Sequence, residues 1–177
     1  MKYPSMAVCQ AQVFSLTASL SRRGMLSAAV GGLATGSLWA AETPALLPGS
    51  QALDRELAQA LQKGEPLVVM VSLSGCHFCK VARESYLAPL LREQAVPIVQ
   101  IDMRTPKPVL AFDGSSQTHD ALARGWGIKV APTVLFFGPG GKEVAERLVG
   151  AYLPDFYGAY LDERIRTARA QLPARKG

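Results

Sequence analysis

The chain has 177 residues, of which 49% are hydrophobic and 19% are charged. This length is typical of one domain with room for a leader, and it excludes a large multidomain assembly. The composition is that of an ordinary globular protein and excludes a disordered chain, a collagen-like chain and a coiled-coil fibre. The formal net charge of +5 depends largely on Lys2, Arg22 and Arg23, which precede the first acidic residue, Glu42. We therefore expect no nucleic-acid partner.

Residues 1–40 are predicted to be an export signal that is removed. Arg22 and Arg23 directly precede an apolar run over 25–41 that is rich in alanine and glycine. This arrangement resembles the twin-arginine (Tat) signal. Ala40 supplies the small residue typical of a cleavage site. The alternative is an uncleaved membrane anchor, but the run is shorter than the roughly 20 predominantly apolar residues that span a bilayer.

Cleavage would leave two cysteines, Cys76 and Cys79, because Cys9 lies within the signal. We expect the mature protein to be a soluble periplasmic monomer. Residues 41–50 are interrupted by Pro, Gly and Ser and are predicted to be a linker. The folded domain is predicted over 51–172, followed by a C-terminal tail over 173–177.

Hydrophobic patterns predict alternating helices and strands in the mature chain. Apolar residues recur at helical spacing in 51–63, whereas 67–73 is a continuous apolar run typical of a strand covered on both faces. Gly-Pro-Gly-Gly-Lys at 138–142 has the chemistry of a hairpin turn. The predicted elements are a helix over 51–63, a strand over 67–73, helices over 76–86 and 89–94, a strand over 96–103, a helix over 118–124, strands over 133–137 and 143–149, and a helix over 155–171.

This order predicts an α/β fold, in which a central mixed β-sheet is flanked by helices on both faces. The last helix is expected to place Phe156, Tyr160, Leu161 and Ile165 on one side. Residues 104–116 are predicted to be a loop, which either shapes the choice of partner or fills space.

Cys76-His77-Phe78-Cys79 follows the predicted buried strand and opens a helix. Unpaired backbone N–H groups and the positive end of the helix dipole favour a thiolate there. Cysteines of CxxC motifs in this setting have pKa values of about 3.5 to 7, compared with about 8.5 for a free thiol. We expect Cys76 in the exposed first turn to attack a substrate disulfide, and Cys79 to resolve the mixed disulfide.

Other roles for the two cysteines are less consistent with the sequence. A disulfide that closes so short a loop stabilises a fold poorly on the chain-entropy argument. A structural zinc site needs four ligands, and His119 has no partner at zinc-finger spacing. Covalent haem requires a histidine after the second cysteine, where Lys80 stands. We expect no metal and no cofactor beyond the redox-active disulfide.

A second segment, residues 127–133, ends in Ala131-Pro132-Thr133 and leads into an apolar strand. Together with the CxxC motif it resembles the thioredoxin family over about residues 51–170. The segments 112–114, 121–127 and 140–144 resemble more specifically the periplasmic SoxW-like thioredoxins linked to sulfur oxidation.

The resemblance implies a thioredoxin-like fold with a cis bond before Pro132, which faces the cysteines, and an Ala131 backbone that pairs with an extended substrate. The alternative is an ordinary trans proline at a strand edge. The resemblance also implies a reductase of protein disulfides that receives electrons from a membrane thiol transporter of the CcdA or DsbD type. A DsbA-like oxidase and a non-catalytic copper-binding chaperone with the same fold stay open.

Some positions depart from the thioredoxin pattern. Gly75 stands where a tryptophan is common, Met70 replaces a buried aspartate that serves proton transfer, and Glu84 replaces a helix proline. Glu84 is either the missing proton acceptor or a solvated charge.

Four further residues carry specific expectations. His77 either stabilises the thiolate when protonated or is simply solvated. Phe78 is predicted to be an exposed apolar contact for substrate. His119 is predicted to lie on the surface, and Trp126 to pack in the fold.

Overall fold

The computed structural model describes residues 47–150 and 154–174. The export signal predicted over 1–40, most of the linker predicted over 41–50 and the last residues of the tail lie outside this part of the chain. None of the helices in the described ranges combines the length and apolar character needed to cross a membrane.

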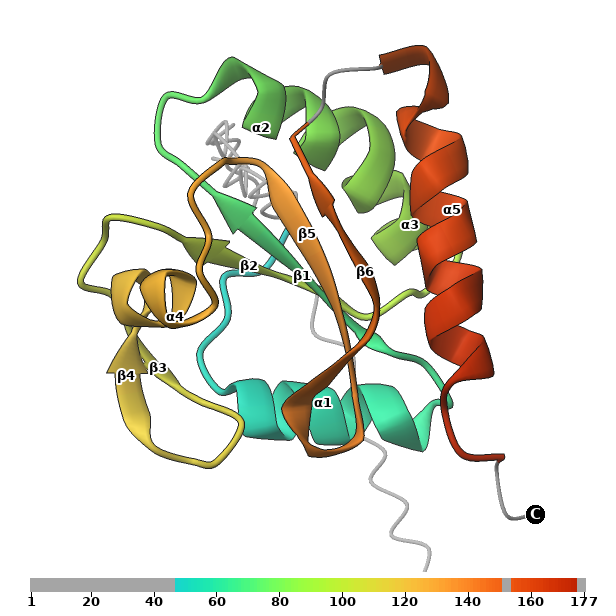
Figure 1. Cartoon of the computed structure of the whole chain (residues 1–177), viewed down its shortest axis with the longest axis horizontal. Helices are drawn as coiled ribbons and strands as arrows, with labels where there is room; N and C mark the ends of the chain where they lie inside the picture. Colours follow the sequence, from blue (N-terminus) through green and yellow to red (C-terminus); the bar gives the residue numbers. More distant parts are fainter. Residues whose placement is uncertain (1–46, 151–153, 175–177) are drawn as a thin grey trace, which may run out of the picture. The chain divides into compact units, whose positions relative to one another are not determined.

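A four-stranded mixed sheet forms the centre of the domain (Figure 1). β1 pairs in parallel with β2 and antiparallel with β5, which in turn pairs antiparallel with β6. All six residues of β1 are buried, as expected for a strand covered on both faces. In spatial order the strands are β2 (Ile98–Asp102), β1 (Leu67–Ser72), β5 (Thr133–Gly138) and β6 (Lys142–Val149).

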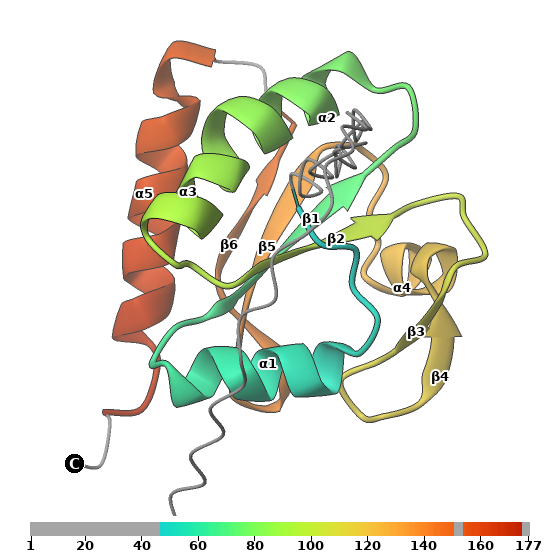
Figure 2. The same ribbon diagram turned by 180° about the vertical axis from the view of Figure 1, so that it is seen from behind.

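Alternate residues of a strand point to opposite faces of a sheet, and here each face has its own core. From β1, Val68 and Met70 enter one core, while Val69 and Val71 enter the other. The first core is closed by α2 (His77–Val81), α3 (Ala88–Glu93) and α5 (Pro154–Ala170), and the second by α1 (Leu53–Gln62) and α4 (His119–Gly125). Figure 2 shows α3 and α5 together, apart from α1. The predicted α/β fold with helices on both faces is confirmed.

The helix that begins after Cys76 continues further than predicted. α2 passes into a π-helical turn, η1 (Ala82–Leu87), and then directly into α3. The predicted break at Pro89 is therefore wrong. Proline normally breaks an α-helix because it lacks an N–H and its ring clashes with the carbonyl four residues earlier. Here the wider π-helical turn accommodates Pro89: the Ala88 N–H bonds to the Arg83 carbonyl, five residues back.

Part of the predicted loop over 104–116 is a strand. β3 (Pro108–Leu110) pairs antiparallel with β4 (Ser116–Thr118) to form a separate two-stranded sheet. Asp113 Oδ1 accepts the Ser115 N–H at 2.9 Å, and Gly114 has a φ of +78°. Asp-Gly is typical of the turn of a β-hairpin, so the sequence did contain a local indication of this one.

α5 buries a different face from the one predicted. Phe156 and Tyr160 are 60% and 46% exposed, so that expectation is wrong for both residues, although Leu161 and Ile165 are buried. The predicted set combined two faces of the helix. The buried residues follow the spacing of three and four that defines a single face: Tyr157, Leu161, Ile165 and Ala168.

Candidate active site

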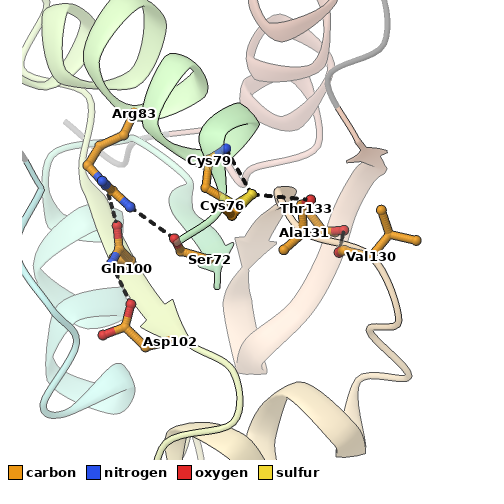
Figure 3. The surroundings of a disulfide bond; sticks show 9 residues. All are labelled: Ser72, Cys76, Cys79, Arg83, Gln100, Asp102, Val130, Ala131 and Thr133. Carbon is orange, nitrogen blue, oxygen red and sulfur yellow. Dashed lines mark hydrogen bonds between the residues drawn. A yellow bond between two sulfur atoms is a disulfide. The ribbon is translucent and has the colours of Figure 1, made fainter. Parts of the chain in front are cut away.

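Cys76 and Cys79 are joined by a disulfide where β1 leads into α2 (Figure 3). Gly75, with a φ of +74°, turns the chain before the helix. Cys76 is the N-cap residue of α2, and its Sγ accepts a hydrogen bond from the Cys79 N–H at 3.1 Å. Cys79 is fully buried, whereas Cys76 is half-buried. A reaction partner therefore reaches Cys76 before Cys79.

The segment before β5 lies against the disulfide. The Ala131–Pro132 peptide bond is cis, and the Ala131 carbonyl oxygen lies 3.7 Å from Cys76 Sγ (Figure 3). Thr133 Oγ1 donates to the Val130 carbonyl at 2.7 Å, and the Pro132 carbonyl accepts the Gly150 N–H at 2.8 Å. These bonds fix the turn, so the structure places Ala131 and Pro132 beside the sulfur of Cys76.

His77 and Phe78 point away from the core. Both are exposed, and their ring centroids lie 5.7 Å apart in an edge-to-face arrangement. Phe78 is 53% exposed, as predicted, and Val130 on the facing segment is also an exposed hydrophobic residue. The surroundings of the disulfide thus present apolar side chains to a partner.

No carboxylate lies at the position six residues before Cys76. Met70 occupies it, fully buried in the core that also contains Cys79. The half-buried Glu84 instead lines a groove beside Cys76. Cys79 itself is not part of the groove wall.

The groove has a volume of about 670 Å³. Its wall contains Cys76 together with a set of titratable side chains: His77, Lys80, Arg83, Glu84, Asp102 and Lys107. In the described part of the chain, no group of three or more His, Cys, Asp or Glu side chains is placed to hold a metal ion.

A chain of hydrogen bonds, which we call the Arg83 network, links η1 to β1 and β2 (Figure 3). Four of its residues belong to the groove wall: Ser72, Arg83, Asp102 and Lys107. The Arg83 Nε–H donates to Gln100 Oε1 at 2.8 Å, and its Nη2–H donates to Ser72 Oγ at 2.9 Å. Gln100 Nε2 in turn donates to Asp102 Oδ1 at 2.5 Å, and Lys107 Nζ lies 2.6 Å from Asp102 Oδ2. Sequence analysis missed this network, although Arg83 stands four residues after Cys79 and Asp102 lies within the strand predicted over 96–103.

Asp102 is ionised within the network. Burial opposes ionisation, but hydrogen bonds from Lys107 and Gln100 and the positive charge of Lys107 outweigh it and hold the pKa of Asp102 below its ordinary value. The network therefore combines one carboxylate with the cations of Arg83 and Lys107.

His119 is buried, so the prediction that it lies on the surface is wrong. It is 2% exposed and lies at the start of α4, which Thr118 caps by accepting the Ala121 N–H at 3.1 Å. Its Nδ1 accepts the Asp102 N–H at 3.0 Å, and its Nε2 lies 2.9 Å from the Ser50 carbonyl. Since Nδ1 is an acceptor, the proton of the neutral ring resides on Nε2.

The sequence profile of the thioredoxin-like domain matches residues 53–165, and the chain belongs to this family. The fold and the CxxC disulfide described above are those of a thioredoxin-like protein. A search of curated proteins finds no match.

Solved thioredoxins share the fold. A poplar thioredoxin h mutant, PtTrxh4C61S, is 20% identical, with 73% of this chain and 90% of that chain covered and a TM-score of 0.50. Thioredoxin NaTrxh from Nicotiana alata is 23% identical, with 67% and 95% covered and a TM-score of 0.43. The periplasmic thioredoxin SoxS from Paracoccus pantotrophus, in its reduced form, is 25% identical, with 59% and 99% covered and a TM-score of 0.39.

Proposed function

We propose that the protein is a thiol:disulfide oxidoreductase that uses Cys76 as nucleophile and Cys79 as resolving thiol. The observation that carries this proposal is the difference in access between the two sulfurs. Cys76 Sγ is reachable, accepts the Cys79 N–H and lies beside the Ala131 carbonyl. A hydrogen bond from an amide stabilises a thiolate more than a thiol, and the thiolate is the reactive form.

The reaction begins with the reduced dithiol. The Cys76 thiolate attacks one sulfur of a substrate disulfide, forms a mixed disulfide and releases the other substrate sulfur as a thiolate. Cys79 loses its proton and attacks Cys76 Sγ, which releases the second substrate thiolate and forms the Cys76–Cys79 disulfide. The two cysteines lose two electrons, which the substrate gains. The proton from Cys79 and one proton from solvent, equivalent to the one that Cys76 lost on becoming a thiolate, convert the two substrate thiolates to thiols.

An extended substrate fits the surface beside Cys76. The backbone of Ala131 borders the sulfur, and a peptide strand placed there can form main-chain hydrogen bonds with it. Phe78 and Val130 add exposed apolar area on either side. We propose that the substrate is a protein whose disulfide lies in an extended segment.

We further propose that the protein acts as a reductase in the periplasm. Arg22, Arg23 and the apolar run after them support export through a twin-arginine signal. The resemblance of 112–114, 121–127 and 140–144 to SoxW-like thioredoxins supports a reductive role, with electrons supplied by a membrane thiol transporter of the CcdA or DsbD type.

Two cysteine variants test the catalytic assignment. Cys76→Ser is expected to abolish reduction of insulin disulfides, because the attacking thiolate is absent. Cys79→Ser is expected to accumulate mixed disulfides, because release of the substrate then has no resolving thiol. Ser85→Ala, exposed on the same helix, serves as the matched control and should retain activity. Turnover by both cysteine variants at the rate of the control would disprove the assignment.

Equilibration with glutathione buffers tests the direction. A reductase is expected to have a potential near that of thioredoxin, about −270 mV, whereas an oxidase of the DsbA type lies near about −120 mV. A potential near about −120 mV would overturn the reductive role but leave the proposed thiol–disulfide exchange intact. Tight 1:1 binding of Cu(I) without any disulfide exchange would overturn both.

A further inference from the structure

Arg83 is held rigidly at the end of the sheet that carries the cysteines. Ser72, the last residue of β1, lies four residues before Cys76, and its hydroxyl accepts a bond from the guanidinium. Gln100 of β2 accepts a second bond. Two acceptors on adjacent parallel strands fix the planar guanidinium in position and orientation. In Figure 3, Ser72 lies between Arg83 and the two cysteines.

The helix brings Arg83 to this position. Arg83 follows Cys79 by four residues and lies in the π-helical turn, whose carbonyl at Arg83 accepts the Ala88 N–H. Residues four apart lie on the same face of a helix, so the side of the helix that presents Cys79 to the sheet also directs Arg83 toward Ser72. π-Helical turns are often found at functional sites.

The charges that share the groove with Cys76 sum to a positive value. The cations are Lys80, Arg83 and Lys107, and the anions are Glu84 and Asp102. Lys107 is paired with Asp102. Arg83 donates to two neutral acceptors instead, so within residues 47–150 and 154–174 its charge is not neutralised by direct contact with a carboxylate.

We propose that Arg83 is a positioning residue of the disulfide site, whose fixed positive charge stabilises the thiolate that forms when the disulfide is reduced. This role rests on the proposed oxidoreductase function. A nearby cation stabilises a thiolate, and the stabilisation is larger where protein replaces water around the two charges. Asp102 opposes the effect through Gln100, so Arg83 and Asp102 set the stability of the thiolate in opposite directions.

The experiment measures the pKa of Cys76 in the reduced protein from the pH dependence of its alkylation, and the potential from glutathione equilibration. Arg83→Gln is expected to raise the pKa of Cys76 by about 0.5 to 1 unit. It should make the reduced form up to tenfold less stable, equivalent to a potential up to about 30 mV more negative. Arg83→Lys keeps the charge and is expected to restore most of both values.

Asp102→Asn provides a test of opposite sign. Removal of the carboxylate leaves the groove more positive, and the pKa of Cys76 is expected to fall while the potential rises. A merely structural role would not give opposite shifts. If Arg83→Gln does not fold, Asp102→Asn still tests the proposal. A raised or unchanged pKa of Cys76 in Asp102→Asn would overturn it.

Two matched variants remove other positive charges. Arg92→Gln, exposed on α3, is expected to leave the pKa of Cys76 unchanged. Lys80→Gln, exposed in the groove wall, is expected to shift it less than Arg83→Gln does. A shift in either control as large as that of Arg83→Gln would overturn the role of the fixed charge.

Failure of this inference is distinguishable from failure of the proposed function. If the unmodified protein exchanges disulfides and the Arg83 variants match it in pKa and potential, the inference on Arg83 alone is wrong. If the unmodified protein does not exchange disulfides, the proposed function is wrong and the inference fails with it.

Discussion

Gly75 determines how the chain passes from β1 to the cysteines. Its φ of +74° lies in the left-handed region, which costs an L-residue with a side chain about 1 to 2 kcal/mol. No atom outside its chain neighbours lies within 4 Å of the place where a Cβ would stand. The requirement for glycine therefore comes from backbone conformation and not from lack of space.

Gly75→Ala is expected to lower the free energy of unfolding of the oxidised protein by about 1 to 2 kcal/mol. Gly125→Ala is the matched control, because Gly125 ends α4 with open space and an ordinary φ. It should leave the stability unchanged or raise it by up to about 1 kcal/mol. Urea denaturation of both variants measures the difference. Equal stability of the two would contradict the conformational argument.

Single residues also show what sequence could and could not reveal. The CxxC motif was identified because a cysteine pair at a strand-to-helix junction has a known physical role, and Pro132 because residues 127–133 resemble a thioredoxin segment. Arg83 lies in η1, whereas Gln100 and Asp102 lie in β2. Their meeting with Ser72 depends on the parallel pairing of β1 with β2. His119 was misplaced for the same reason, since its partners Ser50 and Asp102 are distant in the sequence.

At the scale of elements, apolar runs, helical spacing and turn residues predicted the four strands of the main sheet and the helices that correspond to α1, α2, α3, α4 and α5. These patterns did not predict features that depend on a single residue or a short turn. Pro89 was expected to end the helix, but a π-helical turn absorbed it. β3 and β4 are three residues each, too short for a pattern, and only the Asp-Gly turn between them signalled a hairpin.

The turn between β5 and β6 packs against the segment that follows β3. Gly141 has a φ of +68°, and a Cβ there would lie 2.6 Å from Cγ of Phe112. The Phe112 ring in turn packs against Phe137 of β5, with centroids 4.6 Å apart and the ring planes tilted by 54°. Gly140 has a φ of +70° but open space around it. A side chain at Gly140 would therefore meet only backbone strain, whereas one at Gly141 would meet both strain and a steric clash.

Gly141→Ala is expected to destabilise the fold by about 2 to 4 kcal/mol, because strain and overpacking both act. Gly140→Ala should cost only about 1 to 2 kcal/mol, from strain alone. The free energies of unfolding of both variants test this, and Phe112→Ala combined with Gly141→Ala should recover part of the steric cost. A cost for Gly141→Ala no greater than that for Gly140→Ala would contradict the packing described.

At the scale of the whole domain, Asp102 and His119 join three parts of the chain. The Asp102 N–H binds His119 of α4, whose Nε2–H binds the Ser50 carbonyl ahead of α1, while the Asp102 carboxylate holds Lys107 before β3. A charged group at this junction makes the stability of the fold depend on pH.

The sign of that dependence follows from the lowered pKa of Asp102. The ionised form is favoured in the folded state, so its contribution is complete above the unfolded pKa of about 3.9 and is lost as pH falls through the lower folded value. Asp102→Asn is expected to remove on the order of 1 kcal/mol of stability at neutral pH and to flatten this acid-side loss. Unfolding measured from pH 7 to pH 3 tests it; a profile as steep as that of the unmodified protein would contradict the assignment.

The central claim is that Cys76 is the reactive thiolate of a redox pair, and its rate of alkylation measures this most directly. At pH 6, iodoacetamide should modify Cys76 of the reduced protein at least about tenfold faster than it modifies glutathione, because the Cys79 N–H bonded to its sulfur favours the thiolate. Cys79 should react slowly, because it is fully buried. If neither sulfur reacts faster than glutathione, or if Cys79 reacts first, the account is wrong.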